Sequence, residues 1–266
     1  MKKIWRTPKY LPYVQPALTH EALAAAETQL GHKLPIEYIE LLKIQNGGYI
    51  RYSIAETGHS VIAGIGPYYP SITNLPDWSE SEDWELSFAL DGLVPFDGDG
   101  HWHVCFDYRN QQLEPEITLI DIESSAEEVI APSFKAYLSL LVMEDENEYV
   151  IETNLPIDEA IKQIAAIATN DFEAPDTWAH GYAMYRSKYL GKWVWISPNK
   201  VPAGFVREDD KRFDELKSQM ETSALRFHEL PENALLISTS DEKTTQSLIS
   251  LLTKNAFSVK SLKSFL

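Results

Sequence analysis

The stretch LGHKLPIEYIELLKIQNGG, residues 30–48, predicts the end of one helix, a tight link, a complete second helix and its stop signal. Gly31 can adopt the positive φ that closes a helix. Pro35 suits the first helical position, where its missing N–H leaves no hydrogen bond unmade. The glycine pair at 47–48 should end the second helix, with a left-handed residue as its cap.

One face of the second helix is apolar. Tyr38, Leu41 and Leu42 lie at helical spacing, and Ile36 and Ile39 widen the face that they form. An ordinary helix–loop–helix would show the same pattern, so this stretch alone does not identify a particular fold.

Two further motifs occur later in the chain. Residues 92–100 read GLVPFDGDG and lead into FDY at 106–108, while residues 131–134 read APSF and lead into Tyr137. The glycines of the DGDG segment predict a tight turn before a strand.

The three motifs together resemble the SUKH superfamily, which includes yeast cell-wall-synthesis regulators and many bacterial immunity proteins. The resemblance covers about residues 19–143, roughly half of the chain. It implies an α+β domain with helices packed on a mostly antiparallel sheet, and a protein-binding role. The motif positions, to which we assign structural roles, are Gly31, Leu34, Pro35, Tyr38, Leu41, Leu42, Asn46, Gly47, Gly48, Gly98, Gly100, Asp107, Ser133 and Phe134.

The residues between the motifs also predict α+β structure. Thr19 is a suitable N-cap for a first helix, and Ser133 for a closing one. Alternating residues predict strands over 50–54 and 101–108, and further strands are expected over 61–65 and 117–122. Helices, then strands, then a helix is an α+β order rather than alternating βα units.

The whole chain predicts two soluble domains. Its 266 residues, 44% of them hydrophobic, suffice for packed cores. Cys105 is the only cysteine, no segment approaches the ~18 apolar residues of a membrane helix, and we expect no secretory signal at the basic start. These features predict a cytoplasmic protein. We place the linker in the acidic passage 144–152, which gives a SUKH-like domain over 1–147 and a smaller domain over 148–266.

The net charge of −17 lies almost entirely in the first half. Residues 1–150 hold 24 Asp and Glu against 9 Lys and Arg, whereas residues 151–266 hold 16 against 14. An acidic field repels nucleic acid and anionic membranes and speeds encounter with basic proteins. Solubility alone would also explain it.

Residues 67–85 predict a long surface connection, because prolines interrupt a run of aromatic and acidic residues. Aromatic side chains often anchor interfaces, and carboxylates suit a basic partner. The alternative is that the tryptophans fold back onto the core. The candidate partner-binding residues are Asp77, Trp78, Glu80, Glu82, Asp83, Trp84 and Glu85.

The best candidate for chemistry is the segment from Asp97 to His103. Its two carboxylates resemble part of a calcium loop, but position twelve is Tyr108 instead of the required glutamate. His101 and His103 would share one strand face with Asp107, as a zinc site requires, although exposed histidine pairs are usually plain surface residues. We therefore expect no metal and no cofactor. Catalytic motifs such as G-x-S-x-G and the P-loop are missing, so we expect no enzyme.

The second domain predicts a ferredoxin-like β-α-β-β-α-β order. The expected strands are 193–196, 225–230, 235–238 and 257–262, and the expected helices are 209–220 and 242–252; another helix should begin at Pro156. The aromatic-rich passage 178–195 is interpreted as core, with a binding platform as the alternative.

Three functions remain open from the sequence. The first is an immunity protein that neutralises a toxin, with a basic toxin domain as partner. The second is a regulatory or scaffolding protein like the yeast members of the superfamily. The third, less favoured, is a metal-dependent enzyme using His101, His103 and Asp99.

Overall fold

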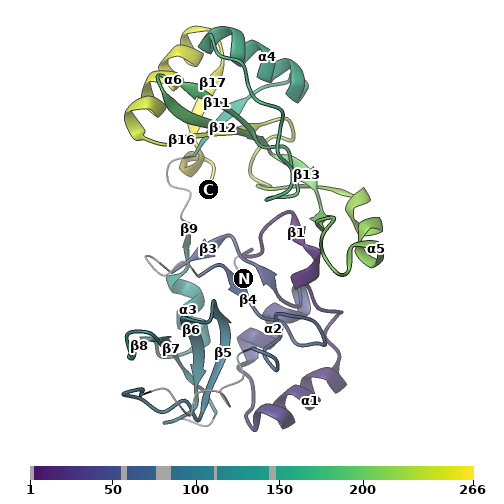
Figure 1. Ribbon diagram of the computed structural model, residues 1–266, viewed down its shortest axis with the longest axis vertical. Coiled ribbons are helices and arrows are strands. Elements are labelled where there is room, and N and C mark those ends of the chain that lie inside the picture. The colour runs from purple at the N-terminus through teal and green to yellow at the C-terminus, as the bar shows by residue number, and fades with distance from the viewer. Residues whose placement is uncertain (1–2, 55–58, 76–84, 111–112, 144–147) are drawn as a thin grey trace. The chain divides into compact units, whose positions relative to one another are not determined.

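The computed structural model describes residues 3–54, 59–75, 85–110, 113–143 and 148–266. The chain divides into two compact units, Met1–Glu144 and Asp145–Leu266. Both units combine helices with antiparallel sheets (Figure 1), so the predicted α+β class is confirmed. Within the described residues, the helices are too short or too polar to cross a membrane.

A four-stranded antiparallel meander forms the main sheet of the first unit, with its strands in sequence order. The described part of the unit also contains two short strand pairs, β2 (Gly48–Tyr49) with β4 (Val61–Ile62) and β3 (Tyr52–Ser53) with β9 (Val142–Met143). The meander consists of β5 (Leu93–Gly98), β6 (Trp102–Asp107), β7 (Glu116–Asp121) and β8 (Ala126–Ala131). The other elements are β1 (Lys9–Tyr10), η1 (Leu11–Tyr13), α1 (His20–Leu30), α2 (Ile36–Ile44), β2 (Gly48–Tyr49), β3 (Tyr52–Ser53), β4 (Val61–Ile62), α3 (Phe134–Leu140) and β9 (Val142–Met143).

Helices α1 and α3 begin where their sequences predict. Thr19 Oγ1 accepts a hydrogen bond from the N–H of Ala22 at 3.1 Å, and Ser133 Oγ accepts one from Ala136 at 3.2 Å. These bonds satisfy amide groups that have no partner within the helix. Helix α1 ends at Gly31, whose φ of +74° is the left-handed cap expected there.

Helix α2 confirms the predicted apolar face but differs at both ends. Tyr38, Leu41 and Leu42 are buried, whereas Ile36 is 69% exposed and does not widen that face. Pro35 is the N-cap rather than the first helical residue, and the C-cap is the extended Gln45. Ile36 therefore faces solvent, although the two residues before it, Leu34 and Pro35, are buried.

Aromatic rings fill the core between α2, α3 and the meander. The Tyr38 ring lies 5.1 Å from Phe106 and 5.5 Å from Phe134, both edge to face. Phe96 lies 4.6 Å from Phe106 and 5.4 Å from Tyr137. Edge-to-face pairs of this kind add to the stability that burial alone supplies. The motif residues Tyr38 and Phe134 are therefore core residues.

Strand β6 alternates as predicted, but both of its faces are covered. Val104 and Phe106 point into the main core, while Cys105 packs with Leu93 and Ile120 in a second, smaller cluster. His103 lies on the face of Cys105 and is only 2% exposed. The expectation that both histidines lie on an exposed face was therefore wrong for His103, which is buried, whereas His101 is exposed.

The second unit has the ferredoxin-like arrangement, with one additional edge strand. Its antiparallel sheet has the order β11-β12-β16-β10-β17. We number β10, β12, β16 and β17 as strands one to four in chain order, and their order across the sheet is then 4-1-3-2. Helix α4 follows the first of these strands and α6 follows the third, as in the ferredoxin-like fold. The elements are β10 (Tyr149–Glu152), α4 (Ile157–Ala168), β11 (Tyr185–Tyr189), β12 (Lys192–Pro198), β16 (Leu235–Thr239), α6 (Glu242–Lys254), β17 (Ser258–Ser261) and the terminal η4 (Leu262–Ser264).

The assignment of chain segments to that arrangement was partly wrong. Strand β10 lies in the predicted linker, yet it pairs with both β16 and β17 in the sheet. The predicted helix 209–220 shortens to α5 (Phe213–Leu216) and a 3-10 turn over Lys217–Glu221, because Asp210 forms a turn with Arg207 that delays the helix. These elements belong to an excursion between β12 and β16.

The predicted strand 225–230 is also a different structure. Buried Asn199 accepts a hydrogen bond from Phe227 N–H at 2.9 Å and donates to the carbonyl oxygens of Phe227 and Pro231 at 3.0 Å each. These bonds hold the segment as a loop. The excursion also contains β13 (Lys200–Pro202), which pairs with β15 (Ser223–Leu225) away from the main sheet, and β14 (Gly204–Phe205).

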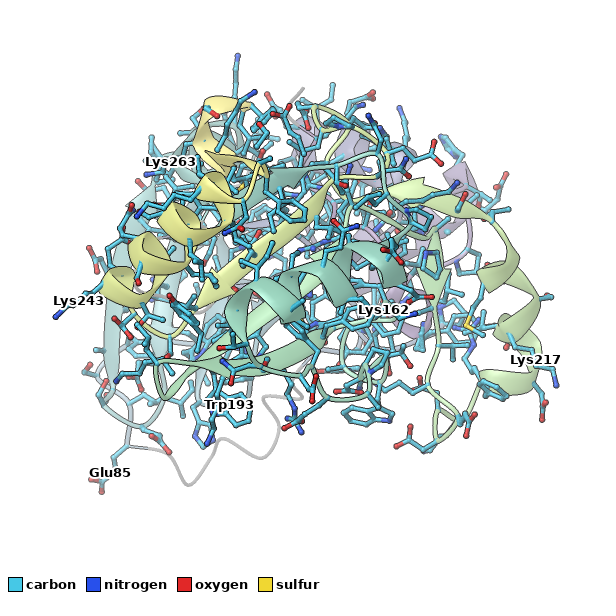
Figure 2. The ribbon with its side chains drawn as sticks, turned by 90° about the horizontal axis from the view of Figure 1, so that it is seen from above. Glu85, Lys162, Trp193, Lys217, Lys243 and Lys263 are labelled. Carbon is cyan, nitrogen blue, oxygen red and sulfur yellow. The ribbon has the colours of Figure 1, made fainter. Side chains whose placement is uncertain are left out.

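Helices α4 and α6 cover one face of the sheet in the second unit. Seen from above, they lie side by side over the strands, with Lys162 and Lys243 on their exposed surfaces (Figure 2). Ile161 and Ile164 of α4, with Leu248 of α6, pack against inward-facing sheet residues. Asp241 caps α6 by accepting from Thr244 N–H at 3.0 Å.

Candidate functional site

The motif residue Asn46 ties three segments of the first unit together. Its Nδ2 donates to the carbonyl oxygens of Pro16 at 2.6 Å and Ile65 at 2.9 Å, and its Oδ1 accepts from Ile65 N–H at 2.8 Å. Gly47 is the next residue, with a φ of +87°. This arrangement brings the start of the chain, the end of α2 and the segment after β4 to one place.

The motif residue Gly98, at the β5–β6 turn, allows the backbone to lie close to the side chain of His103. A Cβ atom on Gly98 would lie 2.0 Å from Nδ1 of His103, so only glycine fits there. Asp99 Oδ1 accepts hydrogen bonds from His101 N–H at 2.9 Å and Trp102 N–H at 3.2 Å. The structure thus confirms the tight-turn interpretation of this segment.

The motif residue Asp107 is the acceptor of a buried ion pair. Arg109 Nε and Nη2 donate to its two oxygens at 2.9 Å and 2.6 Å, and Thr118 Oγ1 donates at 3.0 Å. Burial favours the neutral carboxylic acid, but these hydrogen bonds outweigh it and hold the pKa of Asp107 below its usual value. Asp107 therefore stabilises the sheet instead of facing a ligand.

The residues considered for zinc do not converge. His101 is exposed and forms an ion pair with Glu123 at 2.7 Å, whereas His103 is buried, which lowers the pKa of its ring. Among the residues that the structure describes, no group of three His, Cys, Asp or Glu side chains is close enough to hold a metal ion.

A buried polar network that sequence reasoning missed lies under the β5–β6 turn. His59 forms hydrogen bonds with the Asp97 carboxylate through Nδ1 and with the Tyr137 hydroxyl through Nε2. Asp97 Oδ2 also accepts the N–H groups of Ser60 and Val61 at 3.1 Å each. Burial raises the pKa of Tyr137 far above its ordinary value, so its phenol stays neutral. Because 38 and 78 residues separate His59 from its partners, no local pattern marks the network.

Asp97 also lines a hollow in the first unit, which we name the aromatic pocket. Its volume is about 340 Å³. The pocket brings together residues from the start of the chain, β2, the segment after β4 and the β5–β6 turn. Its lining side chains include Tyr13, Tyr49, Tyr69, Pro70, Leu75, Asp97, Asp99 and Trp102.

The lining of the pocket combines aromatic rings with carboxylates. Tyr13 stacks on Tyr49 with ring centroids 5.1 Å apart, and Tyr69 meets Tyr13 edge to face at 6.0 Å. Burial tends to raise the pKa of Asp99, but the N–H groups of His101 and Trp102 outweigh that effect and leave its pKa below the usual value. Asp99 is therefore ionised at neutral pH, and the described lining residues include no lysine or arginine.

Most of the predicted partner-binding residues lie outside the described part of the chain. Asp77, Trp78, Glu80, Glu82, Asp83 and Trp84 belong to this group, and Glu85 is described as exposed. Leu75, which lines the aromatic pocket, is separated from Asp77 by one residue in the sequence. The pocket and the predicted acidic binding stretch are therefore neighbours along the chain.

The aromatic passage of the second unit divides between two roles. Tyr182 and Tyr185 are buried, as the core interpretation predicts. Trp178 is 57% exposed, lies under the Arg207 guanidinium at 4.3 Å, and lines a hollow of about 590 Å³ with Phe205 and Phe213. The prediction of a core passage therefore holds only in part.

The cysteine of the first unit is not placed for nucleophilic catalysis. Cys105 is buried, and burial together with nearby Asp107 raises the pKa of its thiol. A thiol in that state is a poor nucleophile. The described side chains of the aromatic pocket offer carboxylates and rings, which can hold a positively charged group.

The first unit has the helices packed on an antiparallel sheet that the resemblance to the SUKH superfamily implied. Residues 17–140 match the model of the SMI1 / KNR4 family (SUKH-1), so the first unit is a domain of that family. The resemblance found from the sequence is confirmed. Comparison with curated proteins found no match, and comparison with solved structures found none either.

Proposed function

We propose that this protein is a non-catalytic binding protein, and specifically an immunity protein that neutralises a cognate bacterial toxin by direct contact. The observation that carries the proposal is the SUKH-1 match over residues 17–140, because the superfamily includes toxin immunity proteins. The site of action is the cytoplasm, and the occupied surface is on the first unit.

The charge of the first half supports a basic partner. With 24 acidic against 9 basic residues over 1–150, its field accelerates association with a positively charged toxin domain. Toxins that act on nucleic acid are commonly basic, since they must approach phosphates. The same field disfavours nucleic acid and anionic membranes as partners of this protein.

The experiment first searches the genes beside this one for a large secreted protein with a variable carboxyl-terminal end, and then co-expresses that carboxyl-terminal domain with this protein. Cells that make the toxic domain alone should stop growing, and this protein should restore growth and co-purify with the domain in a defined stoichiometry. A catalytically inactive form of the domain should bind equally well, because neutralisation occurs by occupation of the toxin.

Three outcomes would contradict the proposal. Growth arrest that persists despite soluble expression of this protein would exclude neutralisation. A stable complex with a cellular enzyme of wall synthesis, without any rescue from a toxin, would favour the regulatory alternative that the yeast family members suggest. Loss of toxin activity through chemical change of the toxin would instead indicate an enzyme.

A further inference from the structure

The aromatic pocket has the geometry of a receptor for a positively charged side chain. Tyr13 and Tyr49 present stacked rings, and Tyr69 closes against Tyr13 at a steep interplanar angle of 82°. Trp102, half-buried, lines the pocket from the β5–β6 turn. The faces of phenol and indole rings attract cations within about 6 Å of the ring centre.

Two carboxylates at the pocket have different roles. Asp97 is 5% exposed and is held by His59 and by backbone N–H groups, so its carboxyl group is fixed in place. Asp99 is exposed, and its Oδ1 is used by the turn. Its Oδ2 accepts no hydrogen bond from the described residues, so this oxygen can receive a donor from a ligand.

This combination selects among ligand classes. Anions are repelled by two carboxylates, and a bare metal ion would need more oxygen ligands than the described residues of the pocket place together. A guanidinium or ammonium group can interact with both kinds of lining side chain, because it stacks on aromatic rings and donates hydrogen bonds to carboxylates. A volume of about 340 Å³ lies at the small end of ligand pockets and suits a single side chain.

We propose that the aromatic pocket binds an arginine or lysine side chain of the protein partner. That a protein supplies the cation rests on the function proposed above. The sequence position of the pocket supports a protein as the source of the cation. Leu75 of the pocket lies just before the acidic stretch 77–85, and these carboxylates would add long-range attraction for a basic protein surface. The pocket then anchors one residue of that surface.

The test is a titration of the full-length protein, followed by NMR, with the peptide Ac-Gly-Arg-Gly-NH2. The indole N–H signal of Trp102, assigned with a Trp102→Phe variant, should shift with a dissociation constant of about 1–10 mM, as expected for one anchored side chain. The lysine peptide should shift the same signal. The citrulline peptide, which has the shape of arginine without its charge, should bind at least about tenfold more weakly.

Matched variants locate the binding. Asp99→Asn keeps an oxygen for the turn and removes the charge, and it should weaken the arginine peptide about fivefold. Glu128→Gln is the control, because it removes the same charge from the exposed surface of β8, and it should leave the dissociation constant of the arginine peptide unchanged. Chemical shifts elsewhere in the spectrum report whether each variant remains folded.

Several outcomes would overturn the proposal. Equal binding of the citrulline peptide would exclude recognition of charge. Binding of choline at least about tenfold tighter than the arginine peptide would assign the pocket to a free small cation. No shift of Trp102 at about 20 mM peptide, twice the weakest constant expected, would exclude the site. If the toxin complex forms and rescues growth despite such a result, the immunity function stands and only the assignment of this pocket falls.

Discussion

Gly47 and Gly64 approach each other so closely that a Cβ atom on Gly47 would lie 2.6 Å from the backbone nitrogen of Gly64. The contact is reciprocal, because a Cβ on Gly64 would lie 2.5 Å from the carbonyl oxygen of Asn46. Gly47, the first glycine of the helix stop signal, is thus needed for the packing of two backbones as well as for its positive φ. The motif glycine and a glycine outside the motif meet through this contact.

The first prediction is that Gly47→Ala destabilises the first unit by about 2–5 kcal/mol. A left-handed φ costs about 1–2 kcal/mol for a residue with a Cβ, and overpacking adds about 1–3 kcal/mol. Urea unfolding of the full chain, followed by circular dichroism, measures the change. Gly31→Ala is the matched control, since its φ is also left-handed but no described atom lies within 4 Å of the new Cβ. Equal losses for both variants would disprove the backbone contact.

The contrast between these glycines shows what local sequence can predict. Gly31, Thr19 and Ser133 act on residues a few positions away, so their caps were predicted correctly. The role of Gly64 depends on a partner in another segment, and nothing nearby in the sequence indicates it. The aromatic pocket was missed for the same reason, because its walls come from four separate segments.

Strand β10 shows a different limit of sequence reasoning. It lies directly after an acidic passage and has only four residues, of which Val150 and Ile151 are buried. So short a strand carries too little alternation to be distinguished from a linker. Its place in the sheet is set by long-range pairing with β16 and β17, which local pattern does not contain. The ferredoxin-like order was therefore predicted with incorrect first elements.

The second prediction concerns acid stability through Asp107. The pKa of Asp107 in the folded protein lies below its value of about 3.9 in the unfolded chain. Ionised Asp107 therefore contributes fully to the free energy of unfolding above about pH 3.9, and this contribution is lost as the pH falls through the folded-state pKa. Asp107→Asn should cost about 1.5–3 kcal/mol at pH 7, the range for hydrogen bonds to charged groups. The difference from the parent protein should shrink below about pH 4. Urea unfolding at several pH values checks both statements.

Glu127→Gln provides the control for Asp107. Glu127 also pairs with Arg109, at 2.6 Å, but its side chain is exposed. An exposed ion pair contributes about 1 kcal/mol or less. A Glu127 variant as unstable as the Asp107 variant would show that Arg109, and not the buried carboxylate, is the essential partner.

The third prediction is that Cys105 is chemically inert in the folded protein. Its thiol is buried and its pKa is raised by that burial. A disulfide-exchange reagent such as DTNB at pH 8 should label no cysteine in the native chain and one cysteine in 6 M guanidinium chloride. Rapid labelling of the native protein would contradict the second apolar layer formed by Cys105, Leu93 and Ile120. A surface Ser124→Cys variant, which should react at once, is the control.

The fourth prediction is that each unit folds alone when cut at the observed boundary. Fragments 1–144 and 145–266 should each unfold in one cooperative transition, because each contains its own core. Fragment 151–266 should not, because it lacks half of β10, which pairs with two neighbouring strands. Denaturant titration of the three fragments distinguishes these cases. A fragment 1–144 without a cooperative transition would mean that the first unit needs the rest of the chain.

The last prediction concerns the acidic stretch that precedes Glu85. We expect Glu80, Glu82 and Asp83 to accelerate association with a basic partner, and Trp84 to anchor the complex. Replacing the three carboxylates by serine should slow association and flatten its salt dependence, because exposed charges mainly set the association rate. Trp84→Ala should speed dissociation and cost about 2 kcal/mol or more. Stopped-flow or surface-based kinetics with the toxin domain measures both rates.

Both variants should melt at the temperature of the parent protein. If Trp84→Ala instead lowered the melting temperature and left binding unchanged, Trp84 would be a core residue and the acidic stretch would lose its anchor.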